Sequence, residues 1–251
     1  ENFATDRSTR LRQFKTRYCD VNDNDSGLES VCLDGPTPAT VNRDIDYTRT
    51  LSLTRTLNVD FTDNVLTGDE QDILAMSNYL YANVLPARPS EAILKVPANQ
   101  DEYLDWRSVV AKRSVAENSF NAIVGMKSAG SEDVNGNSRY VQAVLAQLGV
   151  SPEEARAMLG DKPSYYALME VLSQRIYQSP EFYTNLYDKP VNVERKDVAM
   201  QAIDLMLDHD SYRSELRYES MLAVLLEMEL MKYQESVQNR LNGLEERGRR
   251  N

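Results

Sequence analysis

Cys19 and Cys32 are the two cysteines of this sequence, and a polar, loop-like segment separates them. A pair of lone cysteines on either side of a short loop is typical of a disulfide formed in an oxidising compartment. The alternative is two unrelated reduced thiols in a cytosolic protein. A bridge at this spacing would stabilise the fold by roughly 3 kcal/mol, because it restricts the unfolded chain.

The loop that follows Cys19 alternates oxygen-bearing side chains, which are the ligands that calcium prefers. The candidate ligands are Asp20, Asn22, Asn24 and Asp25. An EF-hand starting at Asp20 fails, because its sixth position holds Asp25 in place of glycine and its twelfth position is not glutamate. Calcium binding would therefore need a looser geometry, and a solvated loop is the alternative.

Residues for catalysis are sparse. His209 is the single histidine, so zinc sites and serine–histidine triads lack their further members. The phosphate-cradling and zincin motifs are absent from the sequence. Glu219-Ser220 resembles the pair used by lytic transglycosylases, but apolar residues 221–225 replace the glycine-rich segment that should follow. We expect no enzymatic activity and no cofactor, with a peptidoglycan-processing enzyme of the envelope as the alternative.

Composition limits the partners and the compartment. The 251 residues are 41% hydrophobic, enough for one sizeable core or two small ones, and the net charge is -11. Such an acidic chain repels phosphate backbones, so we expect no direct nucleic-acid binding. No apolar run is long enough for a transmembrane segment. The start at Glu1 resembles a chain after signal-peptide removal, although a trimmed chain would look the same, so we expect a periplasmic or secreted protein.

The first quarter of the chain differs from the remainder. Residues 1–42 carry a basic run, an acidic run and a Gly35-Pro36 break, which predicts an N-terminal extension stapled by the disulfide. Residues 43–61 follow a period of two, which predicts one long β-strand or hairpin segment within residues 43–66. Its unpaired backbone groups would need a partner, within the chain or in another subunit, and an amphipathic helix is the alternative. The predicted interaction residues are Ile45, Tyr47, Leu51, Leu53, Leu57, Val59 and Phe61.

The sequence after residue 66 predicts helices. Thr67 and Glu70 form a capping box that starts one helix, and a second helix is predicted from about Asp101 to Lys127. A polar stretch at 130–137 predicts a hinge between helical subdomains at 67–130 and 137–245. Two further helices are predicted at 194–208 and at 211 to about 241. In the last one an apolar row recurs every seven residues, and we favour the core face of a long helix over a coiled-coil seam. The row is Leu216, Ala223, Leu230, Val237 and Leu244.

Three segments resemble an envelope protein family encoded with conjugative type IV secretion systems and integrating conjugative elements. They are residues 55–63 (RTLNVDFTD), 111–120 (AKRSVAENSF) and 179–190 (SPEFYTNLYDKP). The resemblance implies a periplasmic, non-enzymatic component of a transfer apparatus, and it carries over no catalytic residue.

The sequence therefore predicts a mainly α fold: a multi-helix bundle with an extended N-terminal arm and one long β-strand or hairpin segment. The expected function is a structural subunit that docks to other protein subunits through the arm and the strand, with a homo-oligomer as one arrangement. A calcium-binding adhesin or interaction module is a further alternative.

Overall fold

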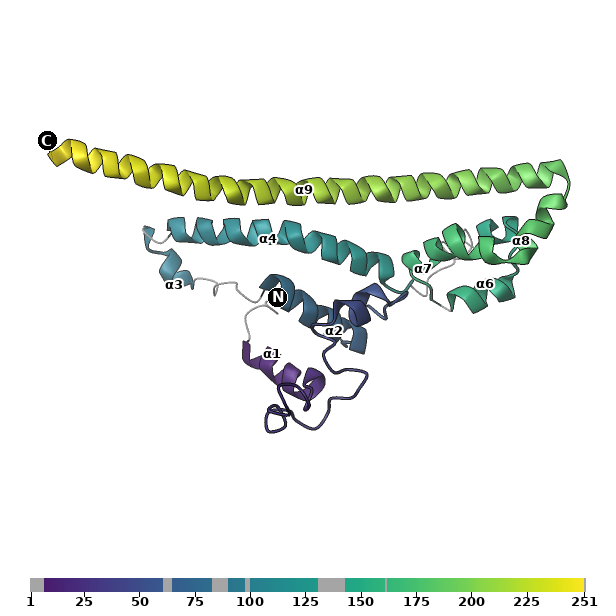
Figure 1. The fold of residues 1–251 in the computed structure, drawn as a ribbon, viewed down its shortest axis with the longest axis horizontal. Helices are drawn as coiled ribbons and strands as arrows, with labels where there is room; N and C mark the ends of the chain where they lie inside the picture. The colour runs from purple at the N-terminus through teal and green to yellow at the C-terminus, as the bar shows by residue number, and fades with distance from the viewer. Residues whose placement is uncertain are drawn as a thin grey trace.

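The computed structural model describes residues 7–60, 65–82, 90–97, 100–130, 143–160 and 162–250. These segments are mainly helical, as the sequence predicts (Figure 1). One long helix, α9 (Pro190–Arg250, 61 residues), runs along one side of the molecule, and α4 (Gln100–Lys127) lies beside it in the opposite direction. Smaller elements gather beneath α4 and at the start of α9.

The N-terminal residues are folded onto the body. Helix α1 (Arg7–Gln13) continues as the π-helical turn η1 (Phe14–Tyr18), and the loop after it returns to a second π-helical turn, η2 (Thr48–Ser52). Tyr18 is buried, and Arg17 pairs with Asp72 of α2 (Gly68–Ser77) at 2.9 Å. The described residues 7–42 are therefore anchored to the body through Tyr18 and Arg17, whereas an arm that extends away from it was expected.

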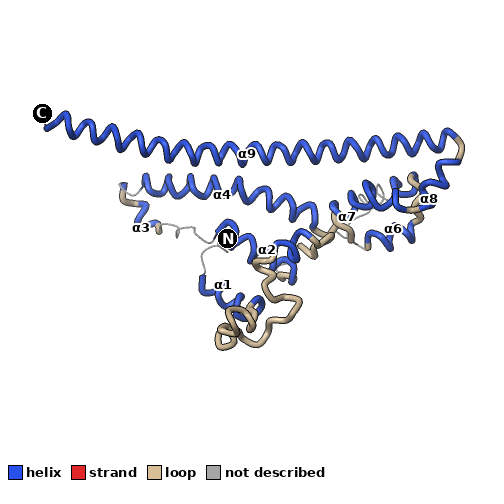
Figure 2. The backbone as a smooth tube through the Cα atoms, viewed as in Figure 1, coloured by secondary structure: helices blue, strands red, loops and turns tan. Residues whose placement is uncertain are grey.

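The predicted strand is also wrong. No β-strand occurs within the described ranges, and Figure 2 shows helix and loop where the strand was expected. Residues 38–45 form turns, 48–52 coil into η2, and Leu57 makes an isolated parallel bridge to Ser128. Backbone groups that a sheet would have paired are satisfied locally instead: the Thr50 N–H donates to Asp46 O, and the Thr50 hydroxyl donates to Arg43 O.

The starts of the helices follow the sequence. Thr67 caps α2 and forms the predicted capping box with Glu70, and Ser151 does the same with Glu154 for α6 (Pro152–Leu159). Both pairs satisfy backbone N–H groups that the first helical turn leaves without partners. Helix α2 continues as η3 (Asn78–Ala82), and the short α3 (Glu91–Leu94) precedes α4.

Two hydrophobic clusters hold the described segments together. The first joins the N-terminal region to α2 and α4; its buried members are Leu51, Leu57, Ile73, Met76, Phe120 and Val124. The second lies among the small C-terminal helices and the start of α9; its buried members are Leu145, Leu148, Ala155, Met169, Val171, Leu172, Ile176, Phe182 and Ile203. The composition allowed one sizeable core or two small ones, and the structure has two small ones. The predicted hinge at 130–137 lies almost wholly outside the described residues.

The C-terminal cluster is built from short elements. Residues 143–147 are helical and are followed by α6. Three consecutive helical segments follow: α7 (Tyr165–Glu170), the π-helical η5 (Val171–Arg175) and the 3₁₀ turn η6 (Ile176–Gln178). Helix α8 (Pro180–Thr184) and the turn η7 (Asn185–Tyr187) lead to α9.

Helix α9 replaces the two helices predicted at 194–208 and 211–241. No glycine or proline separates Asp208 from Ser211, so nothing in the chain ends the first helix, and it continues. Two contacts fix its direction against α4: the Ser119 hydroxyl contacts Met221 Sδ, and Lys112 Nζ contacts Met231 Sδ. Residues earlier in α4 therefore meet residues later in α9, which makes the pair antiparallel.

Candidate functional site

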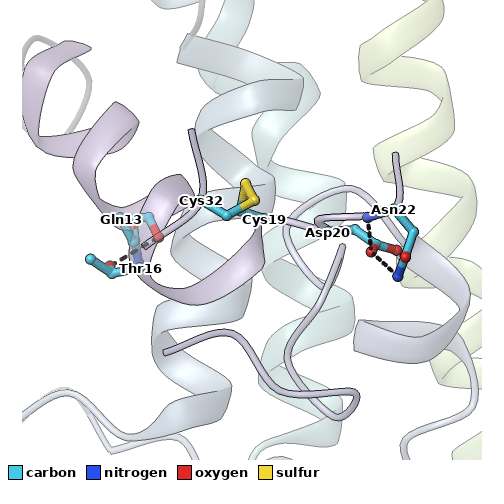
Figure 3. Close-up of a disulfide and its surroundings, with 6 residues drawn as sticks. All are labelled: Gln13, Thr16, Cys19, Asp20, Asn22 and Cys32. Atoms are coloured by element: carbon cyan, nitrogen blue, oxygen red, sulfur yellow. Dashed lines mark hydrogen bonds between the residues drawn. A yellow bond between two sulfur atoms is a disulfide. The ribbon is translucent and has the colours of Figure 1, made fainter. Parts of the chain in front are cut away.

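The disulfide between Cys19 and Cys32 is present, with their Cα atoms 5.5 Å apart (Figure 3). Cys19 is buried beside Tyr18. The bridge closes the loop at its base, while most of the loop itself is exposed. It therefore anchors the N-terminal segment and leaves no free thiol in the chain. A bridge of this kind fits an oxidising compartment.

The calcium candidates lie in this loop. Asp20 Oδ1 accepts hydrogen bonds from the backbone N–H and the side-chain amide of Asn22, at 2.9 and 3.1 Å (Figure 3). Asn24 and Asp25 adopt positive φ angles of 54° and 55°, as short polar side chains in tight turns can. The part of the chain that the structure describes has no group of three or more acidic, histidine or cysteine side chains placed to hold a metal ion. Calcium binding by these residues stays a prediction.

Only part of the predicted interaction surface is accessible. Leu51 and Leu57 are fully buried in the first hydrophobic cluster, and Val59 packs against it. Ile45 and Leu53 are 66% and 72% exposed. Tyr47 is also exposed, and Phe61 lies outside the described residues. The set therefore divides between core and surface, because its residues do not lie along one strand.

A polar network ties the N-terminal segment to α2. Arg17 and Arg43 both face the buried carboxylate of Asp72, at 2.9 and 3.7 Å. Burial raises the pKa of Tyr18 far above its usual range, and the negative charge of Asp72 adds to that effect. Burial also raises the pKa of Asp44 to about 6, and Asp72 again acts in the same direction. The network is a structural anchor, since Asp72 is already paired with the two arginines.

Arg55 joins the two halves of the molecule. Its Nε donates to Glu170 Oε2 at 2.7 Å, and Arg175 donates to the other oxygen of that carboxylate at 3.0 Å. The Arg55 carbonyl accepts from the Ser164 hydroxyl at 2.6 Å. Burial opposes ionisation of Glu170, but the two arginines outweigh it and lower the pKa of that carboxyl. Thus a segment of the predicted strand connects the two clusters, a role that its sequence pattern did not indicate.

The two residues weighed for catalysis are both on the exposed surface of α9. His209 and Glu219 lie mid-helix, and both are exposed. Glycoside cleavage needs a carboxylic acid held in a cleft, and an exposed helical position does not provide one. The position of Glu219 therefore gives the peptidoglycan alternative no support.

The outward face of α9 carries a long row of exposed residues. Ile203, Met221 and Val224 turn toward the body, whereas a row with alternating steps of four and three residues is exposed throughout. We call this row the outer seam. Its described members are Val191, Arg195, Val198, Ala202, Leu205, His209, Tyr212, Leu216, Glu219, Ala223, Leu226 and Leu230.

The outer seam corrects one sequence-based interpretation. Leu216, Ala223 and Leu230 belong to the apolar seven-residue row that was assigned to the core face, yet all three are exposed. Leu205 is 69% exposed and Leu226 is 61% exposed. A row of this spacing on one helix is the arrangement by which two helices interlock in a coiled coil. Sequence reasoning found the row but placed it on the wrong side of the helix.

The total exposed area of the chain is large, as a long helix packed on one side requires. The chain exposes 17525 Å², whereas a compact monomer of 28.6 kDa would expose about 11,300 Å². Large apolar surfaces on a protein mark sites that bind another protein or a membrane. No described helix is both long and apolar enough to cross a bilayer.

No protein-family model, no curated protein and no solved structure matches this chain.

Proposed function

We propose that this chain is a non-enzymatic structural subunit of a periplasmic conjugation or type IV secretion apparatus. The observation that carries the proposal is the outer seam: a mainly apolar heptad row on a helix of 61 residues, exposed along its described length. Exposed apolar surface is unfavourable in water, so a protein that maintains it over such a length is suited to bind a partner along it.

Two further observations support the proposal. The Cys19–Cys32 bridge fits the oxidising conditions of the periplasm. The choice of a conjugation or type IV secretion apparatus comes from the three segments that resemble the envelope family of conjugative elements, since a fold alone does not identify a function.

The docking surface differs from the one that the sequence predicted. Leu51 and Leu57 are committed to the core, so they do not bind a neighbour. The outer seam is the main surface in the revised proposal, and exposed Ile45 and Leu53 offer a second, smaller one. Docking through added β-strands is not part of it.

Affinity purification from cells that carry the apparatus tests the proposal. The full chain would be tagged, crosslinked in the intact envelope and purified, and the captured proteins identified by mass spectrometry. We expect other subunits encoded with the same transfer system, and we expect Leu205→Asp in the outer seam to reduce their recovery. Leu104→Asp on α4, where the side chain is 62% exposed, is the matched control and should leave recovery unchanged. Recovery of the chain alone would contradict the proposal.

A further inference from the structure

We propose that the outer seam binds the outer seam of a second copy of this chain, with the two α9 helices antiparallel. The inference deepens the proposed function by naming one partner within the assembly. It depends on three properties of α9: the separation of the seam from α4, the order of its charged residues, and the area available.

The seam is free to bind because α9 meets α4 with a different face. Met221 contacts α4 through Ser119, and Val224 is partly buried on the same side. Leu226 and Leu230 lie outside the face that contacts α4, with 61% and 45% of their surfaces exposed. A second helix can therefore lie against the seam without displacing α4.

The charged interruptions of the seam decide the partner and its direction. Glu219 is one interruption, and the same seven-residue repeat, continued along the sequence, reaches Arg240 as the next. A parallel pair in register would place Glu219 against Glu219 and Arg240 against Arg240, which is unfavourable at a seam position. An antiparallel pair with Leu226 opposite Leu230 of the second copy brings positions 219 and 240 within three residues, about 4.5 Å along the axis.

The ends of the helix agree with the same alignment. In that register residues 206–216 of one copy run beside residues 240–250 of the other. The first stretch holds Asp208, Asp210 and Glu215 with one arginine, and the second holds four arginines with two glutamates. Opposite net charges thus meet at both ends of the pair, whereas a parallel pair would place like charges together. This reversed self-complementarity is the reason for choosing a second copy over an unrelated helix.

The area suffices for a stable dimer. The overlap would cover residues 206–250, about 65 Å of helix. A standard interface buries roughly 1,600 Å² in total, and a pair of helices in contact over this length offers an area of that order. Most of the remaining exposed surface, including Ile45, Leu53 and the N-terminal part of the seam, stays available to other subunits.

Light scattering coupled to gel filtration tests the inference on the purified, oxidised full chain. We expect twice the mass of the 28.6 kDa chain. Leu226→Asp combined with Leu230→Asp should raise the dissociation constant by more than about 100-fold and give the single-chain mass. Leu225→Asp is the matched control: Leu225 is 55% exposed and outside the seam, so this variant should keep the doubled mass. Circular dichroism would verify that each variant is folded.

Charge exchange tests the direction. Glu219→Arg and Arg240→Glu should each weaken the dimer, and the double exchange should restore it. A wild-type chain that remains a monomer at tens of micromolar, or a dimer unaffected by the Leu226 and Leu230 substitutions, would overturn the inference. Failure of the double exchange to restore the dimer would overturn the antiparallel register. A monomer here would leave capture of other subunits from the envelope unaffected, so the two proposals fail separately.

Discussion

Lys127 Nζ lies 2.7 Å from the carbonyl oxygen of Leu51, and it donates a second hydrogen bond to the next carbonyl, that of Ser52. Lys127 is the last residue of α4, and Leu51 and Ser52 end the turn η2. One buried ammonium group therefore links the ends of two elements, although Lys127 and Leu51 are 76 residues apart in the sequence. The ring of Tyr166 lies 4.4 Å from the same nitrogen. Burial lowers the pKa of Lys127, and the negative charge of Glu170 opposes that effect.

Replacing this lysine should destabilise the fold. Lys127→Met keeps the length of the side chain but leaves the carbonyls of Leu51 and Ser52 without their donor, and we expect a loss of about 2–3 kcal/mol. Lys95→Met is the control, since that lysine is 73% exposed and pairs with Glu91 one turn earlier, so the loss should stay below about 0.5 kcal/mol. Urea unfolding measures both. Equal effects of the two substitutions would show that the Lys127 contacts contribute little.

The disulfide should contribute a comparable amount. Cys19→Ser combined with Cys32→Ser should reduce the free energy of unfolding by about 3 kcal/mol, because the open loop gains conformational freedom in the unfolded chain. Reduction of the wild-type chain provides the control, as it removes the same bridge without a substitution. Unfolding in urea with and without reductant measures the effect. A midpoint that neither treatment moves would contradict the anchoring role of the bridge.

Asp44 should make stability depend on pH. Its pKa is about 6 in the fold against an ordinary value of 3.8, so the folded state holds the proton more tightly than the unfolded state. Below about pH 4 the carboxyl is therefore neutral and does not lower the free energy of unfolding. That free energy falls as pH rises from about 4 through 6, because the unfolded state releases the proton more readily than the folded state. Asp44→Asn removes the charge.

We expect the variant to gain stability relative to wild type by roughly 2 kcal/mol between pH 4 and pH 7.5. Unfolding of both proteins across that range measures the difference, in which groups other than Asp44 cancel. A difference that stays constant with pH would exclude the burial of Asp44 as the cause.

The ion pair that joins the two clusters should also matter. Glu170→Gln removes the charge that Arg55 and Arg175 share, and the pair with Arg55 is partly buried. We expect a loss of about 1–2 kcal/mol at pH 7. The lowered pKa of Glu170 means that wild type has this advantage above about pH 4.5 and loses it as pH falls further. The difference between the two proteins should therefore shrink in acid, and a difference that grows would contradict this sign.

Features that depend on neighbouring residues were predictable from the sequence. The capping box of Thr67 with Glu70 requires only a four-residue pattern, and it is present. The disulfide was also predictable, because the chain holds no other cysteine that could pair with Cys19 or Cys32. The helical class followed from apolar spacing over longer windows.

Features that depend on distant residues were not predictable. The alternation in residues 43–61 predicts a strand, but a strand forms only where another backbone lies alongside over several residues. In the described part of this segment the pairing is limited to the bridge between Leu57 and Ser128. Lys127 and Ser164 instead satisfy the backbone of this segment from far along the sequence. Likewise, the seven-residue row on α9 identifies a helix face without saying which side the core occupies, since Ile203, Met221 and Val224 define a competing apolar face.

Site-specific photocrosslinking in intact cells tests the docking role of α9 most directly. A photoreactive amino acid would replace Leu226 in the outer seam and, as control, Leu104 on α4; both side chains are about equally exposed. We expect crosslinked products heavier than the 28.6 kDa chain from position 226 and few from position 104. If position 226 gives no more crosslinked product than position 104, the outer seam has no partner in the cell and the proposed role of the chain is wrong.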